Sequence, residues 1–497
     1  MEAPVLQDRY DVIIIGSGMA GLTCGAMAAQ AGLSVLVAEK HGKLGGYVQY
    51  FGKEFMFDST LHLLGGCGPG SWIGDTLRRL GIADRLEFVK LDPAYRCRIG
   101  ENEVDIPSDP SQYDELLGSR FPFDRGGLRR VCADMATIGR EGLDQSNGLV
   151  ARYADKTAQT MLDEYVRDRR LHSLICALWP LYGLPPSRLS AAHFAMAWAT
   201  YHAQGGTSFL KGGAKALSDA IASAIQEAGG QVVTKTRVTH ILVEQHSVAG
   251  ILLEDGRTIR ARAVVSNADP HQTWLELVGQ EHIDEEWRVR LETWQPSVSA
   301  VEVHLGVEMP LDVGFHTCVF HDTDDFEVAY QDIFADQPSF PSMVVTVTTK
   351  SDPGRAPAGQ HQVILMGLAD YGRADAWGAP GENPRDRTYR AVERYQHLKE
   401  TIGSRMIAKA ERLIPGLSEH AFIRKVGTPL TMERYTFNHR GAAYGWANIP
   451  SQSGAYRPGP TTSTAGLYLC GHWTFPGGGV AAAIVSGRRA AEAIMEK

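Results

Sequence analysis

Two strand–glycine–helix units, one near each end of the chain, predict an α/β fold built on a parallel sheet. The first unit is the apolar run 10–15, followed by the turn Gly16-Ser-Gly18-Met-Ala-Gly21 and an alanine-rich helix. The second unit is the strand-like run 466–471, followed by a glycine loop and a helix over 481–496. A continuous apolar run bounded by glycine is typical of a parallel strand that is buried on both faces. Because 497 residues exceed one compact core, we expect two or three domains.

The N-terminal turn has the features of a Rossmann-type dinucleotide cradle. The first glycine allows the tight turn, the second lets the backbone approach a pyrophosphate, and the third lets the helix pack closely on the strand. The helix N-terminus offers free N–H groups to the phosphates. A second apolar strand, 33–38, ends at an acid 18 residues after the third glycine, where a carboxylate can accept from ribose hydroxyls. An acid at this position favours FAD or NAD over a 2′-phosphorylated nucleotide. We therefore predict that the dinucleotide is bound by Gly16, Gly18, Gly21, Glu39 and Lys40.

Composition argues against several other classes of protein. The net charge of −8 is dispersed over the chain, so we expect no nucleic-acid partner. The seven cysteines are scattered and form no CxxC pair, which argues against a disulfide framework and a zinc site and favours a reducing cytosol. No apolar run is long enough to span a membrane, and the first strand already begins near Tyr10, so we expect no signal peptide. These features predict a cytoplasmic protein without a metal site.

Two further glycine segments favour FAD over NAD. The pair at 45–46 follows the acid and leads into Gly-Lys-Glu-Phe-Met-Phe-Asp at 52–58, which resembles the second signature of the glutathione-reductase-like FAD enzymes. Such a pair lets the chain run close along an extended FAD. The C-terminal loop precedes a helix N-terminus, whose N–H groups can stabilise negative charge on a reduced flavin. We expect FAD contacts at Gly45, Gly46, Gly471, Gly479 and Val480.

Residues 206–269 predict a helix and a set of strands that return to the first sheet. Leu217, Ile221 and Ile225 recur every four residues, so one face of this helix is expected to be buried. A glycine pair stops the helix. Alternating apolar residues and a glycine turn then predict strands over 232–236, 237–245, 248–253 and 258–263, with 264–269 rejoining the nucleotide-binding sheet.

These segments resemble, in the same order, the phytoene desaturase, carotenoid isomerase and retinol saturase family. The matching stretches are KGGAKAL at 211–217, GGQVVTKTRVTHI at 229–241, DGRTIRARAVVSNAD at 255–269 and GLYLCG with FPGGGV at 466–480. The stretches 57–62, 182–213 and 438–445 are most similar to the isomerase and saturase branch. The resemblance covers nearly the whole chain, and it implies that the backbone of Val238 contacts the adenine.

The resemblance implies an architecture of three parts. A discontinuous, glutathione-reductase-like FAD-binding domain would comprise residues 1–105, 205–295 and 446–497. A mixed sheet over 296–445 would form the substrate domain, and 106–204 would be a helical insertion that faces the substrate or a membrane. The apolar segment 171–201 within the insertion lacks a basic polar face, which favours a buried helix pair over peripheral docking on a membrane. The sequence makes no prediction of oligomeric state.

The function implied by the resemblance is an FAD-dependent oxidoreductase that acts on C–C or C=C bonds. It would desaturate, saturate or isomerise an apolar, carotenoid-, retinoid- or polyene-like substrate. No second glycine-rich nucleotide motif occurs in 110–460, so we expect no NAD(P)H domain. One alternative is a flavin amine, amino-acid or natural-product oxidase on the same scaffold. A more remote alternative is a non-catalytic flavoprotein or prenyl-lipid carrier.

Four residues are candidates for catalysis, each with a structural alternative. His62 follows the Phe-Asp motif and could act as an acid or base or polarise the flavin, or could be a hydrogen-bonded structural histidine. Trp473 could form a wall of the pocket or belong to the core. Arg440 and Tyr444 precede the last FAD segment and could bind a polar group on the substrate, or could make surface and interdomain contacts. Arg440 with Tyr444 is also the sequence's hint of an amine or amino-acid oxidase.

Overall fold

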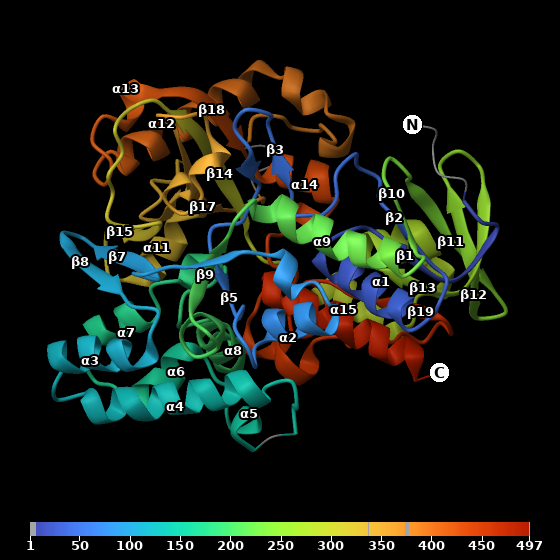
Figure 1. Ribbon diagram of the computed structural model, residues 1–497, viewed down its shortest axis with the longest axis horizontal. Coiled ribbons are helices and arrows are strands. Elements are labelled where there is room, and N and C mark those ends of the chain that lie inside the picture. The colour runs from blue at the N-terminus through green and yellow to red at the C-terminus, as the bar shows by residue number, and fades with distance from the viewer. Residues whose placement is uncertain (1–5, 147, 336, 373–376, 497) are drawn as a thin grey trace.

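The computed structural model describes residues 6–146, 148–335, 337–372 and 377–496. Three parts can be followed in Figure 1: a sheet with flanking helices on the right, a second sheet at the upper left, and a group of helices below it. The predicted α/β class, with one nucleotide-binding sheet, one mixed sheet and a helical insertion, is confirmed.

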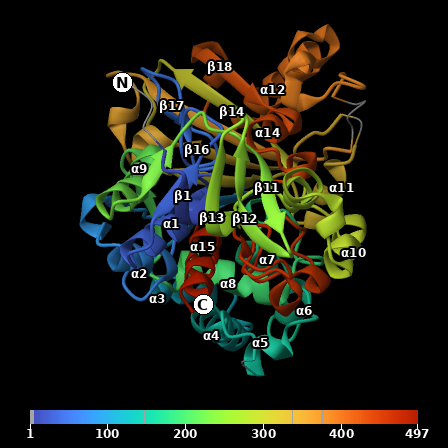
Figure 2. The ribbon, with the colours of Figure 1, turned by 90° about the vertical axis from the view of Figure 1, so that its right-hand side faces the viewer.

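The first sheet has seven strands and gathers residues from both ends of the chain. Its neighbours, in spatial order, are β10 (Gln231–Val233), β2 (Val35–Ala38), β1 (Arg9–Ile15), β13 (Thr258–Ser266), β12 (Ser247–Leu253) and β11 (Val238–Glu244), and β19 (Leu467–Leu469) also pairs with β13. Strands β10, β2, β1, β13 and β19 are parallel, and β13, β12 and β11 form an antiparallel meander. Figure 2 shows this meander from its front.

Three helices cover one face of this sheet: α1 (Met19–Gln30), α9 (Gly213–Glu227) and α15 (Val480–Met495). Their apolar faces bury Leu22, Ile221 and Ile484 together with Ile14 of β1. The opposite face is covered by a second cluster that includes Trp274, Trp446 and Trp473. Burial on both faces explains why β1 reads as an unbroken apolar run.

The second sheet is mixed and also has seven strands. Their order is β18 (Ala421–Gly427), β14 (Ser299–Val307), β17 (His361–Ala369), β16 (Ser342–Val347), β15 (Thr317–His321), β7 (Tyr95–Ile99) and β8 (Asn102–Ile106). The pairing of β15 with β7 is parallel, and the other pairings are antiparallel. Helix α12 (Glu393–Ala410) packs on this sheet through an apolar cluster that contains Ile402 and Met406.

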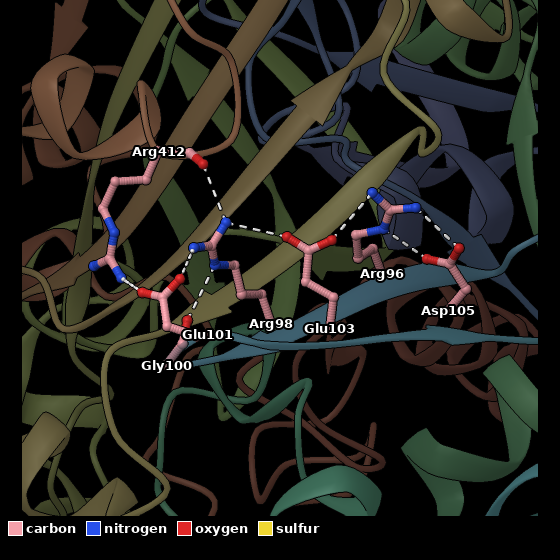
Figure 3. A network of polar contacts seen from close by, with 7 residues as sticks. All are labelled: Arg96, Arg98, Gly100, Glu101, Glu103, Asp105 and Arg412. Atoms are coloured by element: carbon pink, nitrogen blue, oxygen red, sulfur yellow. Dashed lines mark hydrogen bonds and ion pairs between the residues drawn. The ribbon is translucent and has the colours of Figure 1, made fainter.

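The hairpin of β7 and β8 corrects one predicted boundary. We expected residues up to 105 to belong to the FAD domain, yet this hairpin forms the edge of the second sheet. Figure 3 shows ion pairs within the hairpin, Arg96 with Asp105 and Arg98 with Glu101, and one pair that leaves it, Arg412 with Glu101. Arg412 lies just after α12, so these charges connect the hairpin to the segment that covers the same sheet. The rest of the predicted division into domains stays a prediction.

The helical insertion lies below both sheets in Figure 1. It comprises α3 (Pro110–Arg120), α4 (Arg125–Glu141), α5 (Gly148–Arg152), α6 (Ala158–Asp163), α7 (Arg169–Ile175) and α8 (Ala191–His202). Helices α4 and α8 pack against each other, and the apolar side chains of α7 and α8 are buried. No helix in the described ranges has both the length and the hydropathy of a membrane span.

Short elements join these three parts. Strands β3 (Tyr50–Phe51) and β4 (Phe57–Asp58) form a hairpin, and β5 (Leu64–Gly65), β9 (Thr207–Leu210) and β6 (Phe88–Lys90) form a small sheet. The remaining helices are α2 (Trp72–Arg79), α10 (Glu285–Thr293), α11 (Phe326–Asp332), α13 (Leu417–His420) and α14 (Pro429–Thr436). Strand β4 and the segment after it lead directly to the candidate site.

Candidate active site

One cavity of about 280 Å³ runs from the turn between β1 and α1 to strands β14 and β17 of the second sheet. Most of the predicted site residues line it: Gly16, Gly18, Glu39, Lys40, Gly45, Gly46, His62, Val238, Tyr444, Gly471, Gly479 and Val480. Gly21 lies behind the turn, inside α1. Residues far apart in the sequence therefore meet around a single elongated space.

The turn after β1 has a backbone that only glycine fits easily. Gly16 has φ +93°, a region that L-residues rarely adopt. A Cβ at position 21 would lie 2.2 Å from the carbonyl oxygen of Gly16, so the third glycine is needed for the helix to approach the strand. Gly18 is the N-cap of α1, and the free N–H groups of this helix end face the cavity.

The second glycine pair packs directly on the first turn. The N–H of Gly45 donates to the carbonyl of Ser17 over 3.0 Å, and Gly18 and Gly45 form a backbone bridge. Gly45 has φ +111°, and a Cβ there would lie 1.9 Å from the carbonyl oxygen of Val48. A Cβ at Gly46 would lie 3.1 Å from the Cα of Gly18. Both glycine segments thus bring bare backbone to the same stretch of the cavity wall.

Glu39 ends β2 and is held in a fixed orientation. One carboxylate oxygen accepts from the backbone N–H of Ser17 at 2.8 Å and from its hydroxyl at 2.6 Å, and the other accepts from the N–H of His41 at 2.8 Å. A carboxylate offers about four acceptor positions, so capacity remains for ribose hydroxyls. Glu39 is 5% exposed and lines the cavity, as expected for a residue that binds a buried ribose.

The side-chain nitrogen of Lys40 is buried and lacks a hydrogen-bond partner in the described part of the chain. Burial, together with the charges of Arg385 and Arg237 and against the opposing charge of Glu39, lowers the pKa of Lys40 to about 6. The ammonium nitrogen lies 2.9 Å from the centroid of the Phe437 ring. A bound anion would favour the protonated form of this amine, so the position of Lys40 beside the cavity suits an anionic ligand. The glycine cradle, Glu39 and Lys40 together fit a bound dinucleotide.

The C-terminal loop closes the middle of the cavity. Gly479 has φ +104° and precedes α15, whose first residue, Val480, lines the cavity. His472 also lines it, and burial lowers the pKa of this histidine to about 4, so it is neutral near pH 7. This helix N-terminus is the second one that points at the same space, which suits the anionic parts of FAD.

The far end of the cavity is mostly apolar. Its lining comes from the segment after β4, the helical insertion and the second sheet: Leu61, Leu63, Leu181, Tyr201, Ala300 and Met366. Tyr444 donates from its hydroxyl to the carbonyl of Pro180 at 2.9 Å, and burial raises its pKa well above the usual range. A Cβ at Gly183 would lie 2.7 Å from the Tyr444 ring, so the ring is tightly enclosed. This end suits an apolar molecule.

Two titratable residues interrupt this apolar end. Glu302 of β14 is 2% exposed, and one of its carboxylate oxygens lies 3.8 Å from Nε2 of His62. The other oxygen lies 3.3 Å from Nε2 of His304 and has no hydrogen bond of good geometry to any residue that the structure describes. Burial alone would raise the pKa of Glu302, but contacts with His304 and His62 outweigh it and leave this pKa below its ordinary value. Glu302 is therefore an ionised carboxylate in the cavity wall.

Two of the four predicted catalytic residues do not lie in the described cavity lining. Trp473 is 2% exposed, donates from Nε1 to the Asn438 side chain at 3.2 Å, and packs edge-on against Trp446. It is a core residue, because its ring fills the space between the first sheet and the C-terminal loop. Arg440 points away as a partly exposed side chain 4.0 Å from Asp370. The interpretations of Trp473 as a pocket wall and of Arg440 as a substrate ligand are corrected accordingly.

The sequence reasoning missed Glu302 and its neighbour His304. A signal for them exists: in Ser-Ala-Val-Glu-Val-His-Leu-Gly-Val, a charged and a titratable residue stand two positions apart inside an apolar strand. Residues two apart on a strand share a face, so the pattern places both on one side of the sheet. Buried polar groups that interrupt an apolar strand are candidates for a functional site.

Comparison with known proteins bears on both ends of this cavity. The sequence model of a family described as flavin containing amine oxidoreductases matches residues 19–495. Prolycopene isomerase 1 of an Oncidium hybrid cultivar is 25% identical, over 97% of this chain and 83% of the relative. A lycopene-forming phytoene desaturase of a Paracoccus species is 24% identical, over 97% of both chains. The predicted resemblance to carotenoid desaturases and isomerases is confirmed.

Solved structures support the fold. The crystal structure of an oxidoreductase from Methanosarcina mazei superposes with a TM-score of 0.67, at 21% identity, and covers 98% of this chain and 100% of that one. At this level of identity the similarity establishes the architecture alone.

Proposed function

The chain belongs to the family of flavin-containing amine oxidoreductases, and from this we propose that it acts on the carbon–carbon bonds of an apolar, polyene-like substrate. It is an FAD-dependent oxidoreductase whose substrate is an apolar small molecule. The reaction we propose is desaturation, saturation or cis–trans isomerisation. The relatives whose names include prolycopene isomerase and phytoene desaturase favour this class of substrate over an amine.

The single observation that supports this proposal most is the division of one cavity into two chemically different ends. One end presents glycine backbone, Glu39 and Lys40, and the other presents leucine, alanine, methionine and tyrosine side chains. A dinucleotide laid along the first end would bring its reactive part to the apolar second end. An apolar chamber excludes water and holds a long hydrocarbon by burial of its surface.

The chain's own residues have assigned tasks in this proposal. Gly16, Gly18, Gly45 and Gly46 would hold the pyrophosphate region, Glu39 the ribose, and Val238 the adenine. Gly479 and Val480 would hold the flavin end through the N-terminus of α15. Bound FAD exchanges a hydride with a substrate carbon, which is the redox chemistry that the site requires. Tyr444 keeps its proton and shapes the wall through its bond to Pro180.

The alternative of an amine oxidase is supported by the family description and by the carboxylate of Glu302, which could pair with an ammonium group. The sequence suggested this alternative through Arg440 and Tyr444. Tyr444 lines the cavity but Arg440 does not, so the arginine no longer supports it. The apolar surroundings of Glu302 favour a large hydrocarbon over a short amine.

The test is anaerobic incubation of the FAD-loaded protein with a long cis-polyene and with a shorter-conjugated polyene, followed by mass and absorption spectra of the products. A product two hydrogens lighter indicates desaturation, and one two hydrogens heavier indicates saturation. Unchanged mass with a shifted absorption spectrum indicates isomerisation. If both polyenes are returned unchanged while an alkyl amine is oxidised, the proposal is wrong. A Gly45→Ala variant, which should not retain FAD, is the matched control.

We further propose that a peripheral contact with a membrane, if the protein uses one to reach its substrate, is made by the turn between α3 and α4. The segment 171–201, considered for this from sequence, is packed inside the helical insertion. Phe123 in the turn is fully exposed, and the guanidinium of Arg170 lies 5.7 Å above the ring of nearby Phe121. An exposed aromatic residue, Phe123, thus lies two positions from a ring that carries a cation, and aromatic and basic side chains together suit an anionic lipid surface.

Flotation with vesicles that contain phosphatidylglycerol tests this contact. We expect Phe123→Ser to lower the bound fraction at least twofold, because one large apolar side chain contributes about 1.5–3 kcal/mol of burial. Val328→Ser, which removes another exposed apolar side chain from the distant helix α11, should leave binding unchanged. Equal flotation of all three proteins would contradict the assignment.

A further inference from the structure

The apolar end of the cavity contains a negatively charged side chain, the carboxylate of Glu302. Glu302 lines the cavity from the middle of β14 and is 2% exposed. Its neighbours on the cavity wall, Ala300 of the same strand and Met366 across the sheet, are apolar. A buried charge is costly unless it is paired. Its retention here needs an explanation beyond the stability of the sheet.

Two histidines lie close to the Glu302 carboxylate and are themselves held by other residues. His304 Nε2 donates to the carbonyl of Asp58 at 3.0 Å while lying 3.3 Å from Glu302, so this ring is oriented by the β4 segment behind it. His62 lies on the opposite side, and its Nδ1 contacts the hydroxyl of Thr346 at 2.9 Å. Both histidines therefore lie within 3.8 Å of the carboxylate, where they can hold its orientation.

Hydrogen bonding in this group is incomplete. One oxygen of Glu302 and Nε2 of His62 are buried, and neither has a hydrogen-bond partner of good geometry within the described ranges. Arg355, the nearby buried arginine, is already paired with Asp58 at 2.9 Å. In the part of the chain that the structure describes, no cluster of His, Cys, Asp and Glu could hold a metal ion. Glu302 and His62 both line the cavity, so their polar groups lie beside the space that a substrate would occupy.

We propose that Glu302 is the residue that recognises positive charge on the bound substrate, with His62 and His304 as its positioning residues. The inference rests on the proposed function. A polyene carbon that loses a hydride, or gains a proton, becomes part of a delocalised cation. A carboxylate fixed in an apolar, water-poor chamber stabilises such a charge more strongly than it would in water.

A binding experiment tests this charge recognition apart from turnover. The probes are two ligands with the same long isoprenoid chain, one with an internal methylated ammonium group and one with the isosteric neutral carbon. Their affinities for the FAD-loaded protein are measured by quenching of tryptophan fluorescence. We expect the wild-type protein to prefer the ammonium ligand at least about tenfold, which is ~1.4 kcal/mol.

Variants separate Glu302 from other sources of charge. Glu302→Gln should reduce the preference to about one while leaving affinity for the neutral ligand within about twofold. Met366→Lys should also reduce the preference to about one, because Met366 pairs with Glu302 across the sheet and an ammonium group there would neutralise the carboxylate. Met366 lines the cavity, so affinity for both ligands is expected to fall and only their ratio is compared. Glu308→Gln removes an equal charge from the exposed end of the same strand and should keep the wild-type preference. The second cavity variant makes the test independent of whether Glu302→Gln folds.

Each result decides between the inference and the proposed function. A wild-type ratio near one, or a preference that survives in both cavity variants, overturns the role of Glu302. If the neutral polyene ligand binds and polyenes are converted while no preference exists, the inference alone fails. If only short amines bind, and do so through Glu302, charge recognition is supported and the polyene substrate is wrong.

Discussion

The two ends of the cavity are built in opposite ways. The nucleotide end is made of backbone, since glycines at 16, 18, 45 and 46 leave N–H groups and bare Cα atoms at the wall, and the amine of Lys40 lacks a hydrogen-bond partner among the described residues. The substrate end is made of side chains from separate strands, and its one fixed charge is the anion Glu302. The first end is therefore suited to the anionic groups of a cofactor. At the second end, single substitutions of side chains can change which ligand is preferred.

The largest expected effect is the dependence of the free energy of unfolding on pH. Most of the residues responsible lie outside the nucleotide end. Burial lowers the pKa of six histidines to about 3 or 4: His193, His202, His316, His321, His439 and His472. All of them except His472 lie within 106–204 and 296–445. The unfolded chain takes up these protons near pH 6.5, so their stability contribution is complete above that pH and is lost as pH falls toward 4. Each contributes up to about 1.4 kcal/mol per pH unit.

Urea denaturation at several pH values measures this effect. We expect the free energy of unfolding to fall steeply between about pH 6.5 and pH 5. Asp58, whose pKa burial raises to about 6, acts in the opposite direction, but as one group against six. A free energy of unfolding that stays constant over this range would contradict the neutral state of the buried histidines.

The next largest effect tests the link between the two ends. Asp58 accepts from the N–H of Ala214 at 2.9 Å and pairs with Arg355 at 2.9 Å, so it ties α9 of the first sheet to the second sheet. Asp58→Asn should cost about 3–5 kcal/mol, because it leaves a buried guanidinium without its counter-charge. Addition of Arg355→Met should recover part of this loss. Glu244→Gln, which breaks an exposed pair with Arg260, should cost less than about 1 kcal/mol.

A smaller effect tests the backbone construction of the nucleotide end. Gly45→Ala should lower the free energy of unfolding by about 2–4 kcal/mol and abolish FAD retention, since the new Cβ would meet the Val48 carbonyl. Gly32→Ala is the matched control: it has φ +87° but no neighbour within 4 Å of a Cβ, so only backbone strain of about 1–2 kcal/mol is expected. Equal losses in the two variants, with FAD retained in both, would show that the close approach is unimportant.

The smallest predicted effect concerns the ribose. Glu39→Gln should weaken FAD binding by about 1.5–3 kcal/mol, because it replaces a charge-assisted acceptor. Ser17→Ala keeps the charge and removes only the hydroxyl that holds it, so its effect should be smaller. Equilibrium dialysis of FAD measures both, and an unchanged affinity in Glu39→Gln would contradict its assignment.

More of the residues predicted for the nucleotide end than for the substrate end line the cavity, for a physical reason. The glycine turns and Glu39 act through local backbone geometry, so their spacing along the chain carries the information. Glu302 acquires its surroundings from His62, Thr346 and Met366, which sequence order does not bring together. The hairpin β7–β8 was misassigned for the same reason, because only its pairing with β15 places it in the second sheet.

The most direct test of the central claim, that one cavity joins a cofactor end to a polyene end, is an anaerobic titration of the FAD-loaded protein with a long neutral polyene while the flavin absorption spectrum is recorded. We predict that the purified protein retains FAD and that the polyene shifts or bleaches the flavin band at saturating concentration. Failure to retain or take up FAD, or polyene binding that leaves the flavin spectrum unchanged, would contradict the account.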